Sequence, residues 1–173
     1  MLEHLSWSSM NAYDNDIHSF YTRYVLGEEP VYCENVIQAM QFWKEYEIWL
    51  SQWMYKDYDT QKVCEYELGW YKLYGLFDFY NYDKWEIIEC KTKSWWWKEK
   101  DIKSSWQFRI YNYWCMNNWF IFKIHQYNKK EWYYEENKIN REDKTFESDF
   151  INKAQQIERF LKQFNIEVKH YDI

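Results

Sequence analysis

The stretch from Tyr74 to Lys93 places the strongest constraint on the fold. It contains an aromatic-rich run from Leu76 to Tyr82, the dipeptide Asp83-Lys84, and a run dense in β-forming residues from Trp85 to Cys90. Two such runs around a short turn predict a β-hairpin. Antiparallel strands bring distant side chains together, so this hairpin determines which charged residues meet.

Two acids are predicted to face each other across the hairpin. Asp78 lies five residues before the turn and Glu89 five residues after it. Alternation along the second strand places Glu89 and Lys91 on one face and Cys90 on the other. Like charges directly opposed destabilise a sheet, and a divalent cation between the carboxylates would remove that repulsion. In the alternative interpretation the acids belong to a surface hairpin and are salt-bridged to Lys84 and Lys91.

The order of these residues resembles a known signature. Asp78, ten intervening residues and then Glu89-Cys90-Lys91 resemble the active-site motif of the PD-(D/E)xK nuclease superfamily. Gln107 and Tyr111, four apart and therefore on one face of a predicted helix, resemble the Gln-xxx-Tyr motif of its RecB-like and phage-exonuclease branch. The opening helix of that branch is similar to two upstream segments, Leu5–Tyr13 and Phe20–Val25.

The resemblance implies a role for each of these residues. The protein ligands of Mg²⁺ or Mn²⁺ would be the carboxylates of Asp78, Glu89 and Glu47 and the backbone carbonyl of Cys90. Such hard oxygen ligands suit these cations. Lys91 would orient the attacking water and stabilise developing negative charge. Gln107 and Tyr111 would position that lysine or the substrate phosphate.

Glu47 is assigned through a third motif. The segment Phe42–Glu47 resembles the branch's helical Gly-xxx-His/Glu motif, with Trp43 in the glycine position and Glu47 four residues later. Glu45 is the alternative ligand. Residues two apart on a helix do not share a face, so only one of the two acids points to the site. A solvated acid on the helix surface is the simpler explanation for either.

Tryptophan and glycine occur in unusual numbers. The chain has 13 tryptophans and 3 glycines, whereas about 12 glycines are expected from average usage. Trp43 takes a glycine position of the family, and Trp119 follows Asn117-Asn118 in a predicted turn. One hypothesis is that the source organism reads UGA as glycine and that UGA is translated here as tryptophan, in which case Trp43 crowds the site. The alternative is genuine aromatic enrichment in an AT-rich genome.

The charge distribution bears on DNA binding. A net charge of -6 argues against a surface wrapped in nucleic acid, because phosphate binding relies on lysine and arginine. Lysines are nevertheless concentrated directly after the predicted site, among them Lys93 and Lys98. These two, with Tyr13 of the opening helix, are the candidate DNA contacts. A solvated loop is the alternative explanation for the lysines.

The whole pattern predicts a single PD-(D/E)xK nuclease-like domain over residues 1–173. Helices are expected over 8–25, 35–55, 104–116 and 146–164, and strands over 62–70, 76–82, 85–90, 120–127 and 131–138. Asn35 is expected to cap the second helix, and Asp101 or Ser104 the third. The expected fold class is α/β, a restriction-endonuclease-like core whose mixed central sheet of about five strands is flanked by α-helices.

Several classes of protein are disfavoured by the sequence. The chain has no apolar run of about 18 residues and no basic-then-apolar leader, so neither a membrane span nor a signal peptide is expected. We therefore expect an intracellular, cytoplasmic location in a bacterium or a phage-infected host. The four cysteines are scattered and lack metal-site spacing, so free thiols and no iron-sulfur cluster are expected. Three isolated glycines exclude a phosphate-binding P-loop in this translation.

The sequence thus predicts a metal-dependent DNA exonuclease in DNA recombination, repair or phage DNA processing. One alternative is a structure-specific or restriction-like endonuclease. Another is a catalytically inactive nucleic-acid-binding accessory protein that keeps the nuclease fold. DNA is the expected partner, and the acidic balance favours a protein partner that brings it, such as a helicase or an annealing protein. Small exonucleases of this branch often form rings, so the resemblance is compatible with an oligomer.

Overall fold

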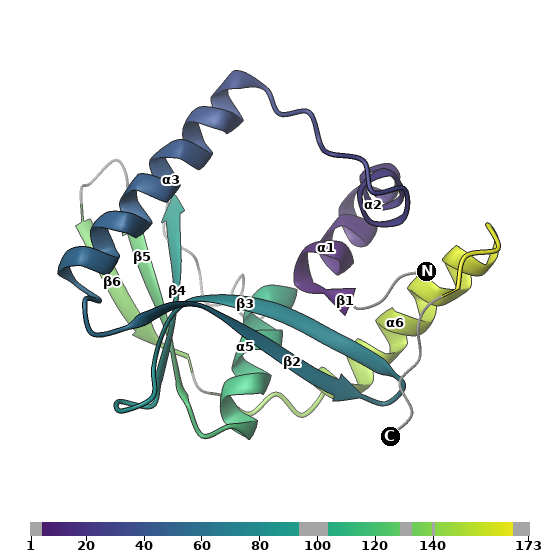
Figure 1. Cartoon of the computed structure of the whole chain (residues 1–173). Coiled ribbons are helices and arrows are strands. Elements are labelled where there is room, and N and C mark those ends of the chain that lie inside the picture. Colours follow the sequence, from purple (N-terminus) through teal and green to yellow (C-terminus); the bar gives the residue numbers. More distant parts are fainter. Residues whose placement is uncertain (1–4, 94–103, 129–132, 140, 168–173) are drawn as a thin grey trace.

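The computed structural model of the chain, drawn in Figure 1, describes residues 5–93, 104–128, 133–139 and 141–167. Within these residues the fold is mixed α/β, with a mixed six-stranded sheet flanked by helices. This is the fold class that the sequence predicts. No helix in the described part of the chain is long and apolar enough to cross a membrane.

The elements follow the predicted order. The helical segments are α1 (Trp7–Asn15), α2 (Ile17–Phe20), the π-helical turn η1 (Tyr21–Val25), α3 (Glu34–Trp53), α5 (Trp106–Asn117) and α6 (Phe146–Lys162). The strands are β1 (Leu5–Ser6), β2 (Asp59–Leu68), β3 (Tyr71–Asn81), β4 (Glu86–Lys93), β5 (Ile121–Asn128) and β6 (Tyr133–Lys138). Residues 94–103, between β4 and α5, lie outside the described residues.

Strand β3 is the centre of the sheet. One of its edges pairs with β2 along nearly its whole length; the other pairs with β1 at Leu73 and Tyr74 and with β4 from Phe79 to Asn81. Beyond β4 follow β5, in parallel, and β6, antiparallel. The two-residue β1 is the strand that the sequence does not predict, because two residues are too few to show an alternation pattern.

The predicted hairpin is present with the predicted register. Phe79 pairs with Ile88 in the antiparallel β3–β4 ladder. The ladder ends at this pair, and Asp78 and Glu89 are the next residues on the two strands. The register agrees with the sequence prediction, which counts equal distances from the turn.

Capping residues account for the differences in helix boundaries. The first predicted helix is interrupted at Asp16, whose backbone is not helical and whose side chain caps α2. The second begins after Cys33 rather than with Asn35 as its cap. The third has Ser105 in the cap position, where the sequence predicts Asp101 or Ser104.

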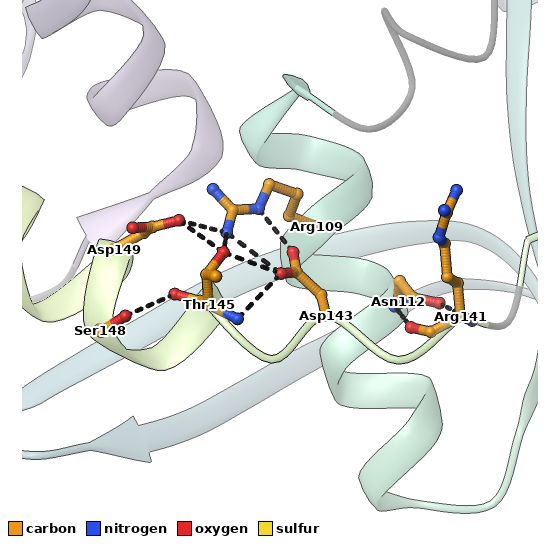
Figure 2. Close-up of polar contacts among 7 residues, drawn as sticks. All are labelled: Arg109, Asn112, Arg141, Asp143, Thr145, Ser148 and Asp149. Atoms are coloured by element: carbon orange, nitrogen blue, oxygen red, sulfur yellow. Dashed lines mark hydrogen bonds and ion pairs between the residues drawn. The ribbon is translucent and has the colours of Figure 1, made fainter.

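The larger core lies between the sheet and helices α1, α5 and α6, as Figure 1 shows. An ion-pair network joins α5 to α6 (Figure 2). Arg109 of α5 donates from Nε to Asp143 Oδ2 and from Nη2 to Asp149 Oδ2, both at 2.7 Å. Asn112 of α5 exchanges two hydrogen bonds with the main chain of Arg141, on the segment before α6. These contacts fix α5 between the sheet and α6.

A smaller core attaches α3 to the other side of the sheet. Its buried members are Leu50, Tyr55, Phe79, Ile88 and Cys90. Beside it, the buried His125 of β5 bonds through Nε2 to Tyr46 OH and through Nδ1 to Tyr55 OH, both at 2.8 Å. Tyr55 donates its own proton to Glu136, so Nδ1 is the protonated ring nitrogen. Burial lowers the pKa of His125 to about 4, and the neutral ring therefore holds α3 in place at neutral pH.

Candidate active site

The candidate site forms where one edge of β3 is left open. This edge pairs with β1 up to Tyr74 and with β4 only from Phe79 onward. Between these points, from Gly75 to Asp78, it has no partner strand within the described residues. A pocket of about 400 Å³ opens there. Its lining comes from five elements: Ser6, Trp7, Ser8, Tyr74, Gly75, Leu76, Asp78, Glu89, Lys91, Gln107 and Tyr111. The pocket thus brings together five of the residues that the sequence singles out.

Strand β3 rotates at Asp78. Phe77 packs edge-on against Tyr111 of α5, whereas Phe79 packs against Tyr55, which follows α3. Residues two apart in a regular strand share a face, so the backbone between these phenylalanines must turn. That rotation directs the Asp78 carboxylate to β4, where Oδ2 accepts the Cys90 N–H at 2.8 Å.

Glu89 is the most buried acid of the pocket, with 2% of its surface exposed. Its Oε1 accepts hydrogen bonds from Lys91 Nζ and Gln107 Nε2. Its Oε2 is buried and has no hydrogen-bond partner within the described residues. Buried carboxylate oxygens are normally paired, so Oε2 is an exception among the described side chains.

The two predicted positioning residues on α5 act on different parts of the site. Gln107 holds Glu89, as described above. The Tyr111 hydroxyl donates to the Leu76 carbonyl at 2.7 Å and accepts the Leu76 N–H at 3.3 Å. These hydrogen bonds replace those that a partner strand would make with Leu76 on the open edge of β3. Gly75 makes this approach possible, because a Cβ there would lie 2.6 Å from a Tyr111 ring carbon. Tyr111 therefore fixes the strand that carries Asp78.

Burial and mutual interaction shift the pKa values of the three ionisable side chains Asp78, Glu89 and Lys91 in the pocket. Burial, together with the charge of Asp78, raises the pKa of Glu89 to about 8. Burial also raises the pKa of Asp78, against the opposing effect of Lys91. For Lys91, burial opposes the cation, but the charges of Glu89 and Asp78 outweigh it and raise the pKa. Lys91 is therefore protonated at neutral pH, and ionising both acids is costly without a further positive charge.

Glu47 of α3, the third predicted ligand, is half-buried and accepts a hydrogen bond from Gln61 Nε2 at 2.8 Å. Burial and then the charge of Asp78 raise its pKa. Glu45, the alternative ligand, is exposed. Trp43 packs against the smaller core beside Tyr46. Neither Trp43 nor Glu47 is among the residues that line the pocket.

A divalent cation fits the donor chemistry of this pocket, although its ligands are not preassembled. Among the described residues, no three histidine, cysteine, aspartate or glutamate side chains form a group that could hold a metal ion. Asp78 and Glu89 nevertheless both line the pocket, and Glu89 Oε2 has no hydrogen-bond partner among the described residues. Cys90 buries its thiol in the smaller core, and its N–H donates to Asp78, so its main chain is the part that faces the site. Carboxylate and carbonyl oxygens are the ligands that Mg²⁺ and Mn²⁺ prefer.

The start of α1 forms a wall of the pocket, beside the site, where the resemblance places the opening helix. Ser6, Trp7 and Ser8 all line it. Ser6 accepts the Ser9 N–H at 3.2 Å, and Ser9 Oγ accepts the Ser6 N–H at 3.0 Å. This is a capping box with serine in place of the usual Glu or Gln. The atypical residue explains why the sequence pattern sets the helix start later, at Ser8.

Of the predicted DNA contacts, Tyr13 lies away from the pocket. Its ring packs edge-on against Phe20 and Phe160, and its hydroxyl donates to the Gln156 carbonyl at 3.4 Å. Tyr13 therefore packs α1 against α6. Lys98 lies outside the described residues, and for Lys93 the structure describes only its place at the end of β4.

Comparison with known proteins bears on the fold. No family model matches the chain, and no curated protein matches it. Among solved structures, the crystal structure of SSO0001 is similar, with a TM-score of 0.56, 13% sequence identity, and coverage of 89% of this chain and 76% of that chain. At this identity the likeness shows a shared mixed α/β fold, and the chemistry of the site has to be argued from its own residues.

Proposed function

We propose that this protein is a Mg²⁺- or Mn²⁺-dependent deoxyribonuclease of the PD-(D/E)xK type that degrades DNA from its ends inside the cell. One observation carries the proposal: Glu89 Oε2 is buried without a hydrogen-bond partner among the described residues, in the pocket that Asp78 and Lys91 also line. Leaving a buried polar oxygen without a partner is costly. A bound cation would remove that cost and join the two carboxylates.

Each pocket residue has a task in phosphodiester hydrolysis. A divalent cation, when bound, supplies charge neutralisation at the phosphate and a more acidic water. Lys91, which is protonated, would stabilise negative charge on the scissile phosphate and orient the attacking water. Gln107 keeps the Glu89 carboxylate in one orientation, and Tyr111 keeps Asp78 opposite it. The positive end of the α1 dipole lies at the same pocket and favours a phosphate there.

The exonuclease mode is supported by the resemblance of Gln107 and Tyr111 to the motif of the RecB-like and phage branch. With a net charge of -6, the protein has little general affinity for DNA. The proposal therefore includes a protein partner, such as a helicase or an annealing protein, that delivers DNA ends.

Cleavage of end-labelled linear and closed circular DNA, with Mn²⁺, Mg²⁺ or EDTA, tests the proposal. We expect metal-dependent loss of the linear DNA alone. Lys91→Ala should lower the rate by about 10²–10³-fold, as for the loss of one group that stabilises transition-state charge. Lys144→Ala is the matched control, since Lys144 is 79% exposed and is not among the residues that line the pocket.

The other outcomes separate the alternatives. Cutting of closed circular DNA, which has no ends, would show that the protein is an endonuclease and not an exonuclease. DNA binding by correctly folded protein without cleavage in any metal would overturn the proposal in favour of an accessory protein that keeps the nuclease fold.

A further inference from the structure

Gln61 has an unusual backbone conformation beside the proposed site. Its φ of 59° is in the left-handed region, which non-glycine residues seldom adopt. Thr60 pairs with Phe79 in the β2–β3 ladder. Gln61 therefore lies opposite Asp78, at the point where β3 rotates. Strain of this kind persists only where the surroundings impose it, and it clusters at functional sites.

The conformation coincides with a specific contact. Gln61 Nε2 donates to Glu47 Oε1 at 2.8 Å, across from β2 to α3. The charges of Glu47 and Asp78 also interact, so the two carboxylates lie on the same side of the site. The contact with Gln61 therefore fixes the orientation of the Glu47 carboxylate beside Asp78.

We propose that Gln61 is a positioning residue that holds Glu47 beside Asp78 and Glu89 as the third carboxylate of a divalent-cation site. The inference rests on the proposed function, because it concerns the same cation. Neither the sequence motif nor the strand pattern indicates this role for Gln61. Outer-shell partners that orient metal ligands typically change metal affinity by about 10–100-fold when removed.

Calorimetric titration of the protein with Mn²⁺, without DNA, tests this role. Gln61→Gly removes the amide but fits the left-handed backbone, so the metal-free protein should keep its melting temperature or gain a few degrees. The Kd for Mn²⁺ should rise about tenfold. Asn165→Gly is the matched control, because Asn165 is also left-handed, with φ 56°, and lies after α6. It should leave the Kd unchanged.

The failures of the two proposals are distinguishable. Wild-type protein that binds no Mn²⁺ would overturn both the cation site and the role of Gln61. Wild-type protein that binds Mn²⁺ with the same Kd as Gln61→Gly would overturn the role of Gln61 alone. A lower melting temperature of metal-free Gln61→Gly would show a structural role in place of a positioning one.

A second, independent observation concerns the helix ends. Three helical segments finish with a left-handed residue: Gly27 after η1, Asn165 after α6 and Trp119 after α5. After α5, Phe120 N–H donates to the Cys115 carbonyl at 2.9 Å, the hydrogen bond of a Schellman motif. Glycine, and less often asparagine, occupies the left-handed position of that motif. A tryptophan there, with φ 65° and 85% exposed, is out of place.

A second tryptophan has the same conformation in the central hairpin. Trp85, with φ 53° and 51% exposed, ends the turn before β4. Its N–H donates to the Tyr82 carbonyl at 3.3 Å. Hairpin turns with a left-handed residue at this point favour glycine. Two of the 13 tryptophans, in a chain with only 3 glycines, thus occupy left-handed positions that favour glycine.

We infer that residues 85 and 119 are glycine in the protein made by the source cell, which reads as glycine the UGA codons translated here as tryptophan. Peptide mass spectrometry of the natively produced protein tests this inference directly. Peptides that contain glycine at both positions are expected. Tryptophan at both positions would overturn the inference.

Recombinant variants provide a second readout. Trp85→Gly and Trp119→Gly should each raise the melting temperature by a few degrees, because the strained residue is replaced by one that fits. Trp114→Gly is the control: Trp114 is 8% exposed and packs against Phe77, so its removal should lower the melting temperature. A lower melting temperature for both Trp85→Gly and Trp119→Gly would contradict the inference.

Discussion

The two carboxylate oxygens of Glu89 differ in their hydrogen bonding. One oxygen is held by Lys91 and Gln107, and the other has no donor among the described residues. Burial and the charge of Asp78 raise the pKa of Glu89 from its ordinary value of 4.5 to about 8. Between these values the folded protein keeps a proton that the unfolded chain releases. The stability of the metal-free protein therefore depends on pH through this residue.

We expect the metal-free protein to lose stability as the pH rises from about 5 to 8. The folded state binds more protons than the unfolded state in this window, so each pH unit lowers the free energy of unfolding by up to about 1.4 kcal/mol. Urea unfolding in EDTA at several pH values measures this. Glu89→Gln should flatten most of the dependence, leaving a smaller slope from Asp78 and Glu47, whose pKa values are also raised. The same steep slope in Glu89→Gln would refute the assignment.

At the scale of elements, α5 connects the site to the rest of the molecule. Gln107 and Tyr111 point to the pocket from one face of the helix, while Arg109 points to α6. The guanidinium spans Asp143, Thr145 and Asp149, as Figure 2 shows. A planar group with several donors makes these contacts at once. The orientation of the helix, and thus of its two pocket residues, depends on this bridge.

Replacing Arg109 with lysine keeps the positive charge but removes the planar set of N–H donors. We expect Arg109→Lys to lower the free energy of unfolding by about 1–2 kcal/mol, because one ammonium group cannot satisfy both aspartates. Chemical denaturation measures the loss. Arg159→Lys is the matched control, since the side chain of Arg159 on α6 is exposed and donates to the Gln155 carbonyl. Equal effects of the two substitutions would show that the bridge contributes nothing specific.

Elements whose signals are local could be predicted from the sequence. The hairpin register follows from equal counts on either side of one turn, and the spacing of Gln107 and Tyr111 follows from the period of one helix. Features that depend on distant pairing could not be predicted. Strand β1 exists only because Leu5 lies beside Leu73, and the left-handed Gln61 lies opposite the position where the distant strand β3 rotates.

The whole molecule places its site at the junction of five elements that lie far apart in the sequence. The pocket takes walls from β1, α1, β3, β4 and α5, and Figure 1 shows these segments converging around the middle of β3. The sequence motif supplies the reactive groups, but the strand edge that exposes them results from β1 and β4 pairing with different ends of β3. Composition and alternation describe each strand separately and carry no information about such a gap.

The open edge of β3 also sets an order of events during synthesis. Ser6 leaves the ribosome early, its neighbour Leu5 has no strand to join until β3 has followed, and Tyr111 emerges later still. Contacts between residues so far apart in sequence form slowly, because a long loop must close first. A nascent chain that stops before α5 already carries Asp78 and Glu89 on a hairpin, but neither Gln107 to hold the acid nor Tyr111 to hold the strand. The groups of the pocket thus become organised only after α5 has been made.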